Sequence, residues 1–556
     1  MTTRARAARC SLLLACLASA AGPAWAQRLG QLPSVSPDVT DRARVRYLLG
    51  DDSVVRTGSS PLLRSASSLF REGTIPGTRH FSVLAPDLLF EGNTGFPYSY
   101  NDGALWSGKG GNGLVRAGVM AEWSRVRLVI APEVVYSTNR PWVAFLLPIY
   151  YGPIQYPDRS LFSAPWYRLP RSIDNPWRFG PNHYARLEPG QSSITARVGG
   201  AAEIGVSSEN EWWGPGIRNA LVLSNNAPGF PHVFARTRRP LGSRIGTFDL
   251  RWILGGLAES AFFDTSTTNN RQSFSAAAAV WRPPATSGVA GLSVGIARAV
   301  YAPAGDGWRS VAARPLDFLA GTNRPDNVAD ADSLTMAPGR DEINSLFAQW
   351  AFPGAGFEVY GEWARTELPR SVRDFLLFPD HTRGYTVGLQ WLRASRASHA
   401  HWRVQAEATN LEQGASFQSR PEGIWYTSRA VPQGYTHRGQ VIGAAIGPGA
   451  SSQWIGADYL AQDWSAGVVG QRIRWNNDAL YYALRFPSNS GNGYCEHDVT
   501  LSPGFRGTFT SRLGAFAGEL LLQNRLNYFF QNASGCPRGL TMRDLRNKAL
   551  SIRWSP

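Results

Sequence analysis

Apolar and polar residues alternate with a period of two over much of this chain, from about residue 81 to its end. In residues 115–123, Val, Ala and Trp at the odd positions alternate with Arg, Gly, Met and Glu at the even positions. Because successive side chains of a strand point to opposite faces, this pattern predicts β-strands. The same alternation recurs in residues 126–130, 248–254, 357–363, 402–409 and 550–554.

In these segments one face is apolar with aromatic residues near its ends, and the other face carries the charges. This pattern is typical of a transmembrane β-barrel with a wet lumen. A soluble sandwich with its charged face outside would have the same period. The length of the chain, the number of alternating segments and the aromatic strand ends favour the barrel, which must close because lipid cannot satisfy an open edge. We predict an all-β fold over residues 81–556, a large antiparallel transmembrane barrel of about sixteen to twenty strands.

Residues 27–80 do not alternate and read as helical instead. Ser36-Pro37 and Ser60-Pro61 each place a capping serine before a proline that suits the first helical position. The first pair predicts a helix over residues 38–49, and the second predicts a helix from residue 61 to about residue 70. We expect this small helical unit to lie on the periplasmic side and to pack under the barrel.

The first 26 residues have the features of a signal peptide. Basic residues precede an apolar run, which ends at Ala24-Trp25-Ala26. After cleavage only Cys495 and Cys536 remain, either as a disulfide formed in an oxidising compartment or as two free thiols. No other segment reaches the roughly 18 consecutive apolar residues of a spanning helix. An exported chain of this kind is either soluble or a barrel.

Composition narrows the choice of partner. The chain has 20 Trp, 19 Tyr and 57 Gly, which suits many strands, tight turns and interfacial aromatic belts. The formal net charge of +15 favours acidic partners. Because no Lys/Arg-rich run or nucleic-acid module appears, we expect no nucleic-acid partner. Anionic lipid and acidic polysaccharide are the acidic partners that remain.

Residues 210–234 are the least ordinary stretch of the chain. Trp212 and Trp213 are followed at once by Gly-Pro-Gly, and Asn225, Asn226 and His232 come later in the stretch. Indoles can stack on the C–H faces of sugars while amides bind their hydroxyls, so the composition favours a carbohydrate site. The alternative is a loop folded into the lumen, whose amides satisfy its own buried backbone.

The same stretch carries a family resemblance. Its letters N-E-W-W-G-P-G and L-S-N-N-A-P-G-F-P-H resemble the signature segment of the capsule-assembly Wzi family of outer-membrane proteins. The similarity extends to residues 173–180, 190–192, 239–241 and 245–246, and a second block covers residues 434–443. The resemblance implies an outer-membrane barrel near eighteen strands in size. It also implies a lectin that binds capsular or other surface polysaccharide and helps to assemble or attach it at the cell surface.

The two blocks supply candidate glycan-binding residues that offer stacking faces, amides or cations. Arginine at such a site could hold a sugar carboxylate with two parallel hydrogen bonds. The candidates are Trp212, Trp213, Asn225, Asn226, His232, Arg236, Tyr435, His437, Arg438 and Trp454. The expected partners are an acidic capsular or surface polysaccharide, outer-membrane lipid and the barrel-insertion machinery. We expect no metal and no cofactor.

Two other functions compete with the lectin. One is a porin-like channel for anionic solutes, lined by arginine. The other is a glycoside hydrolase using Glu358, Glu362 and Glu407, although carboxylates in an arginine-rich lumen serve more often as counter-charges. No nucleophile, metal or nucleotide motif supports catalysis, so we expect no enzyme. Long loops are expected over residues 138–190, 303–345 and 413–450.

Overall fold

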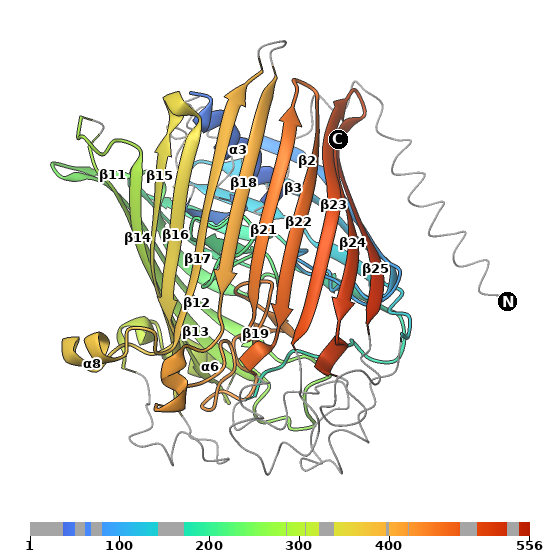
Figure 1. Ribbon diagram of the computed structural model, residues 1–556. Helices are drawn as coiled ribbons and strands as arrows, with labels where there is room; N and C mark the ends of the chain where they lie inside the picture. Colours follow the sequence, from blue (N-terminus) through green and yellow to red (C-terminus); the bar gives the residue numbers. More distant parts are fainter. Residues whose placement is uncertain are drawn as a thin grey trace.

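The computed structural model describes residues 37–50, 62–67, 80–142, 172–284, 286–305, 307–321, 339–395, 400–420, 422–478, 497–530 and 544–556. Its strands close into one antiparallel barrel with eighteen strand positions. Figure 1 shows the wall that they form. Residues 1–26, with the expected signal peptide, and both Cys495 and Cys536 lie outside the described residues. In chain order the wall consists of β2 (His80–Asn93), β3 (Gly110–Trp123), β4 (Val126–Ile130) with β5 (Glu133–Ser137), β6 (Tyr184–Glu188) with β7 (Ser193–Val198), β8 (Ala202–Ser207), β10 (His232–Thr237) with β11 (Leu241–Ser243), β12 (Gly246–Ala258), β13 (Arg271–Arg282), β14 (Leu292–Pro303), β15 (Asp341–Phe352), β16 (Phe357–Arg365), β17 (Arg383–Ala394), β18 (His401–Asn410), β21 (Ser451–Leu460), β22 (Trp464–Trp475), β23 (Asp498–Ser511), β24 (Gly514–Leu526) and β25 (Leu545–Ser555).

The predicted strands are confirmed, and so is the direction of their faces. The six alternating segments lie in β3, β4, β12, β16, β18 and β25. In β3, Arg116 and Glu122 are buried towards the lumen, whereas Trp123 is exposed on the outer wall. Indoles gather on the outside near one end of the wall, as in the aromatic girdle of a membrane barrel. They include Trp281, Trp350, Trp391, Trp402, Trp464 and Trp554.

The two ends of the barrel differ in the length of their connections. At one end, here the short-turn end, β3 joins β4 through residues 124–125 and β23 joins β24 through residues 512–513. At the other, the long-loop end, the connections include residues 208–231 and 411–450. Figure 1 shows the C-terminus at the short-turn end, above, and helices α6 (Trp308–Ala312) and α8 (Val372–Leu377) below. Within the described residues, no helix is long and apolar enough to cross a membrane.

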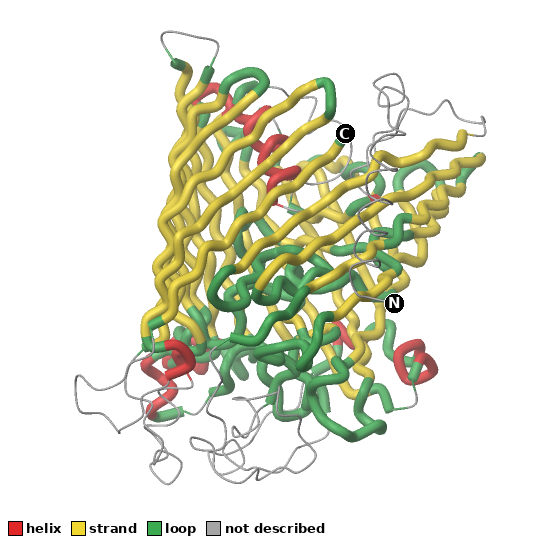
Figure 2. The backbone as a smooth tube through the Cα atoms, turned by 90° about the vertical axis from the view of Figure 1, so that its right-hand side faces the viewer, coloured by secondary structure: helices red, strands yellow, loops and turns green. Residues whose placement is uncertain are grey.

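The first predicted helix is present, as α3 (Pro37–Leu48). It lies inside the mouth of the barrel at the short-turn end (Figures 1 and 2). Arg44 donates from Nε to Glu358 of β16 at 2.9 Å, and Asp41 forms an ion pair with Arg403 of β18. Helix α3 is therefore tied to the wall by buried charges, and the apolar Leu48 is completely buried at its end.

The second predicted helix is wrong where the structure describes it. Residues 63–65 form strand β1 (Leu63–Ser65), which pairs with β9 (Glu211–Trp213) in the lumen. Backbone pairing with a strand about 150 residues away overrides the local capping signal here, since tertiary contacts routinely override propensity. The pairing also brings the N-terminal segment against the Trp-Trp stretch.

One side of the inner face is apolar, which corrects the expectation that charged residues line the whole inner face. Inward positions of β13 are apolar, with Phe274, Ala276 and Ala278 buried among Ile253 and Phe347 of neighbouring strands. The cause is the loops that fill the lumen, because their apolar residues pack against this side of the wall. Burying apolar surface there stabilises the filled barrel, at about 25 cal/mol per Å².

Candidate functional site

Two loops fold back from the long-loop end and fill the lumen. We call residues 208–231 and 422–450 the plug; Figure 2 shows these loops inside the wall. The second loop contains a small hairpin, β19 (Thr436–His437) and β20 (Gln440–Val441). Ser224 donates its N–H to the carbonyl of Ile442 at 2.9 Å, and Tyr435 donates its hydroxyl to the carbonyl of Val222 at 2.8 Å. The two motif-bearing blocks therefore form a single structure.

One carboxylate of the wall holds the plug in place. Glu407 of β18 accepts three successive backbone N–H groups, from Ile217 at 2.6 Å, Arg218 at 3.0 Å and Asn219 at 2.8 Å. It also accepts the hydroxyl of Tyr360 at 2.8 Å. Hydrogen bonds to a charged group contribute about 1.5–3 kcal/mol each before competition among them is counted. Glu407 is thus a structural anchor.

A second carboxylate fixes the neighbouring turn. Glu362 accepts the N–H of Leu221 at 3.1 Å and the hydroxyl of Ser345 at 2.8 Å. Gly214 has a φ of +116°, and a Cβ there would lie 2.9 Å from Oε2 of Glu362, so the turn requires glycine. Since Glu358 is occupied by Arg44, all three carboxylates considered for hydrolysis have structural partners.

The two indoles that open the plug are completely buried. Trp212 and Trp213 both have 0% exposure. Trp213 donates its Nε1–H to Glu211 at 2.9 Å, and the guanidinium of Arg64 lies 5.1 Å from the ring of Trp212. The prediction that these indoles stack on a sugar is wrong for this structure, because neither presents an accessible face. The alternative, an inward-folded loop, is the arrangement observed.

Three further candidates near the first block are also buried. Asn225 donates to the carbonyl of Asn101 at 2.7 Å, and Nδ1 of His232 lies 2.8 Å from a nearby backbone carbonyl. Arg236 pairs with Glu203 at 3.0 Å and donates to two serine hydroxyls as well. Its hydrogen-bonding capacity is used inside the lumen, so it does not hold a sugar carboxylate.

The candidates of the second block are likewise committed to the plug. Tyr435 is fully buried. Nδ1 of His437 accepts the N–H of Ala258 at 3.0 Å, and burial, with the nearby charge of Arg438, lowers the pKa of His437 to about 3. Arg438 forms an ion pair with Glu188 at 2.5 Å. These residues brace the hairpin against the wall.

Trp454 lies deeper, on the lumen face of β21. It is 4% exposed and lies between two guanidinium groups, Arg218 at 5.3 Å and Arg506 at 4.8 Å from its ring. Such cation–π contacts are worth about 0.5–2 kcal/mol each. Trp454 therefore stabilises the charged part of the lumen and offers no face to a ligand.

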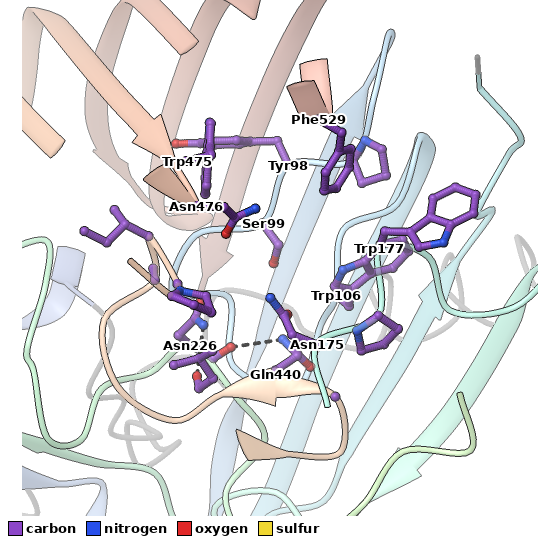
Figure 3. A pocket seen from close by; sticks show the side chains of 18 of the residues that line it. Tyr98, Ser99, Trp106, Asn175, Trp177, Asn226, Gln440, Trp475, Asn476 and Phe529 are labelled. Carbon is purple, nitrogen blue, oxygen red and sulfur yellow. Dashed lines mark hydrogen bonds between the residues drawn. The ribbon is translucent and has the colours of Figure 1, made fainter. Parts of the chain in front are cut away.

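An accessible site is found elsewhere, at the long-loop end between the plug and the strand ends. It is a cavity of about 160 Å³, formed by the β2–β3 connection, residues 175–177, the plug and the ends of β22 and β24 (Figure 3). We call it the rim pocket. Half of its lining residues are aromatic or amide residues. The full lining is Pro97, Tyr98, Ser99, Trp106, Asn175, Pro176, Trp177, Asn226, Gly439, Gln440, Val441, Ala445, Ile446, Gly447, Pro448, Trp475, Asn476, Arg525, Tyr528 and Phe529.

Three indoles of the rim pocket are only partly buried. Trp106 packs against Phe179, with ring centroids 4.8 Å apart. Trp475 donates its Nε1–H to Thr500 at 2.8 Å, which fixes the orientation of its ring at the end of β22. Trp177 lies on the opposite side of the pocket in Figure 3. Partly buried and fixed aromatic rings are suitable stacking platforms, because little conformational entropy is lost when a ligand binds.

The amides of the rim pocket fall into two classes. Asn226 donates to the carbonyl of Val441 at 3.0 Å, and Gln440 donates to the carbonyl of Asn226 at 3.0 Å. By contrast, the side chains of Asn175 and Asn476 make no hydrogen bond within the described part of the chain. Each can both donate to and accept from a hydroxyl group.

The cation in the pocket wall is already neutralised. Arg525 donates to both oxygens of Asp498, at 2.7 and 2.6 Å. Its guanidinium also lies 4.4 Å from the ring of Tyr528 and 5.1 Å from that of Trp475. A bidentate pair of this kind leaves little net charge for a ligand. The rim pocket therefore favours an uncharged, hydroxyl-rich group over a free anion.

A buried carboxyl supports the wall of the pocket from behind. Asp174 accepts both the N–H and the hydroxyl of Ser260, each at 2.6 Å, and so joins residues 172–177 to the β12–β13 connection. Burial raises the pKa of Asp174 to about 6. On the other side, Tyr98 donates its hydroxyl to Gln471 at 2.9 Å, and burial raises the pKa of Tyr98 well above its ordinary value.

Of the ten sequence candidates, only Asn226 lines the rim pocket. Trp177 belongs to residues 173–180, which resemble the family without having been selected as a site. Trp475-Asn476 repeats the indole–amide pairing at the end of a strand, and that signal could have found it. Within the described ranges no three His, Cys, Asp or Glu side chains gather to hold a metal ion.

Comparison with known proteins gives one family and a set of barrels. The family described as "Capsule assembly protein Wzi" matches residues 87–462. Among solved structures, Wzi of Escherichia coli, an outer membrane protein involved in group 1 capsule assembly and a carbohydrate-binding β-barrel, shares 9% identity over 84% of each chain, with a TM-score of 0.51. OccK2 of Pseudomonas aeruginosa shares 12% identity over 85% of this chain and 97% of its own, with a TM-score of 0.36. None of the curated proteins matches.

Proposed function

Because this chain belongs to the capsule assembly protein Wzi family, we propose that it is an outer-membrane lectin for capsular or other surface polysaccharide. In this proposal the barrel holds the rim pocket at the cell surface, since long loops of such barrels face outwards. One sugar unit of the chain occupies the pocket, and the rest of the polysaccharide passes across its mouth. The protein thereby helps to attach or assemble the polysaccharide without turning it over.

The observation that carries the proposal is the combination of partly buried indoles and unused amides in one pocket. Trp177 and Trp475 offer flat apolar faces, and Asn175 and Asn476 offer amide groups that make no hydrogen bond to the described residues. Sugars present C–H faces and hydroxyls, so both kinds of group find a partner. A pocket that bound an apolar ligand would not need free amides, and one that bound an anion would not neutralise its arginine.

The polysaccharide was expected to be acidic, and the net charge of +15 still favours this. The charge would act by attraction over a distance, because Arg236, Arg438 and Arg525 all have carboxylate partners. We therefore propose that affinity depends on stacking and hydroxyl recognition, while the rate of association depends on salt. A neutral oligosaccharide containing the correct sugar should still bind in this proposal.

The plug weighs against the rival channel for anionic solutes. It occupies the lumen with a packed apolar cluster and with carboxylate anchors on the wall. Two arginines of the lumen that could line an anion path, Arg403 and Arg506, are both paired with Asp458. A low conductance in planar bilayers is expected for the lectin, whereas a porin would conduct steadily.

The test is binding of purified surface polysaccharide from the source bacterium to the Trp177→Ala variant. Removing the indole should weaken the apparent Kd about tenfold, which corresponds to roughly 1.4 kcal/mol. Trp308→Ala is the matched control, because Trp308 is 49% exposed on α6 and does not line the rim pocket. Its affinity should equal that of the wild type. Equal affinity of Trp177→Ala and wild type, with both barrels folded, would refute the site.

A further inference from the structure

The outer wall of the barrel carries a second cavity, unrelated to the plug and the rim pocket. It is a groove of about 990 Å³ that extends across the wall from β8 and β10 to β16. Strand register places Ala279, Ile296, Leu346 and Trp363 side by side along one row of this wall. Ile296 is 58% exposed and Leu346 is 51% exposed. The small alanine leaves a furrow between larger apolar neighbours on the lipid-facing surface.

One step closer to the loops, the adjoining row becomes polar. There the same register aligns Arg298, Asn344 and Arg365 on β14, β15 and β16. This change from an apolar row to a polar row matches the boundary between the hydrocarbon and the headgroups of a membrane. The groove therefore crosses from the level of acyl chains to the level of headgroups.

Segments from the long-loop end fold outwards and cover the polar end of the groove. Residues 315–319 lie against the wall, where Trp252 donates its Nε1–H to the carbonyl of Pro315 at 2.9 Å. From the other side Phe375 of α8 contacts Trp363, with ring centroids 6.0 Å apart. Phe318, Leu319, Leu368 and Pro369 complete the cover. The groove is thus open along the wall and roofed at its polar end.

Arg365 is the unusual member of this site. It is 2% exposed and lines the groove, yet no carboxylate contacts it among the described residues. It makes one long hydrogen bond, from Nη2 to the carbonyl of Phe378 at 3.5 Å, while Nε and Nη1 make none. The Nδ2 group of Asn344 beside it is also unpaired. Its row neighbour Arg298, by contrast, is paired with Glu342.

The carboxylates of Asp374, Glu367 and Glu422 act on this guanidinium only from a distance and make no ion pair with it, so its loss of water is only partly offset. Trp363 and Phe375 offer only ring faces, at 6.0 and 5.9 Å from its centre. A phosphate would supply what is missing, since the planar fork of arginine matches two phosphate oxygens. An acyl chain attached to that phosphate would lie along the row of Ala279 and Ile296.

We propose that this groove binds a phosphate-bearing acylated lipid of the outward-facing leaflet. The phosphate contacts Arg365 and Asn344, and one acyl chain fills the furrow over β13. The lipid thereby becomes a bound component of the barrel wall, next to the loops that surround the rim pocket. This inference depends on the orientation of the barrel in the membrane and is independent of glycan binding.

The experiment uses the full mature chain, purified in detergent and mixed with bisphosphorylated lipid A, with bound lipid counted by native mass spectrometry. Arg365→Gln should reduce retention about tenfold relative to wild type. Arg393→Gln is the matched control, because Arg393 stacks on Trp391 of the same outer wall at the short-turn end. It should retain lipid as the wild type does.

A second variant covers the case in which Arg365→Gln does not fold. Ala279→Trp fills the furrow without touching Arg365, and it should also abolish retention while polysaccharide binding stays normal. Dephosphorylated lipid A and inorganic phosphate should each bind far more weakly than the intact lipid. Wild-type retention by either variant, or equal binding of inorganic phosphate alone, would overturn the proposal.

Discussion

The plug and the rim pocket contain the same kinds of residue, but these residues have opposite roles in the two regions. Trp212 and Trp213 are completely buried among wall residues and the β1 strand, whereas Trp177 and Trp475 are partly buried and line a cavity. The amides differ in the same way. Asn225 of the plug donates to a backbone carbonyl, while the side chain of Asn476 in the pocket makes no hydrogen bond to the part of the chain that the structure describes. The two regions therefore have similar residue types. They differ in whether the polar side chains find hydrogen-bond partners inside the protein.

The comparison shows that an indole next to amides has two uses in a barrel. Inside the lumen, a loop must satisfy its own backbone, and indoles exclude water around it. At the rim, the same loop residues meet solvent, and unused amides become binding groups. The variants that follow separate these two uses.

The largest effect is expected from Trp213→Ala in the plug. Removing a fully buried indole should lower the free energy of unfolding by about 3–5 kcal/mol. It should also raise the single-channel conductance, because the plug loses its packing against the wall. Urea unfolding and planar-bilayer recordings measure the two effects. Trp177→Ala is the matched comparison, and it should leave both properties near wild type. A stable, closed Trp213→Ala barrel would contradict the role assigned to the plug.

A smaller effect is expected from Glu407→Gln, which keeps the size of the anchor but removes its charge. An amide accepts the three N–H groups of residues 217–219 less well, and the loss should be about 1.5–3 kcal/mol. Hydrogen exchange of those three amides should become faster, as measured by mass spectrometry of the corresponding peptide. Glu122→Gln serves as control, because Glu122 lies on β3 and pairs with Arg197 of β7 in the wall. Unchanged exchange in Glu407→Gln would show that the anchor is dispensable.

The smallest effect is a pH dependence of the rim pocket through Asp174. Its folded pKa of about 6 lies above the ordinary value near 3.9 for an unfolded chain. Between these values the folded protein binds more protons, so the stabilisation is fully present below about pH 4 and is lost as pH rises through 6. The free energy of unfolding should therefore fall between about pH 4 and pH 6, as measured by urea unfolding at each pH. In Asp174→Asn this fall should be absent, and a wild-type pH profile in that variant would exclude Asp174.

The wall of the barrel could be predicted because its signal is local. A period of two in residues 115–123 or 402–409 fixes both the strand and its inward face, whatever the rest of the chain does. The aromatic strand ends and the long loops carried the remaining information about the membrane. Counting the alternating segments predicts about sixteen to twenty strands, and the family resemblance implies a number near eighteen.

The interior could not be predicted in the same way, because burial in a lumen is decided by distant partners. The sequence around Trp212 does not reveal that Glu407 and Glu362 of the wall bind the backbone of this segment. The capping signal at residues 60–61 is genuine chemistry, yet residues 63–65 form a strand because β9 offers free backbone groups. The rim pocket joins residues from six separate connections between wall strands, so only its indole–amide pairs could be predicted from the sequence.

Helix α3 has a consequence for the order of assembly. Its ion pair between Arg44 and Glu358 joins positions 314 residues apart, and its partner Arg403 stands on yet another strand. The part of the chain that is synthesised first thus finds its partners only when β16 and β18 already stand in the wall. Contacts across such distances in sequence form late, because closing a long loop costs entropy before any contact repays it. We therefore expect α3 to dock in the mouth of the barrel after β16 and β18 have joined the wall.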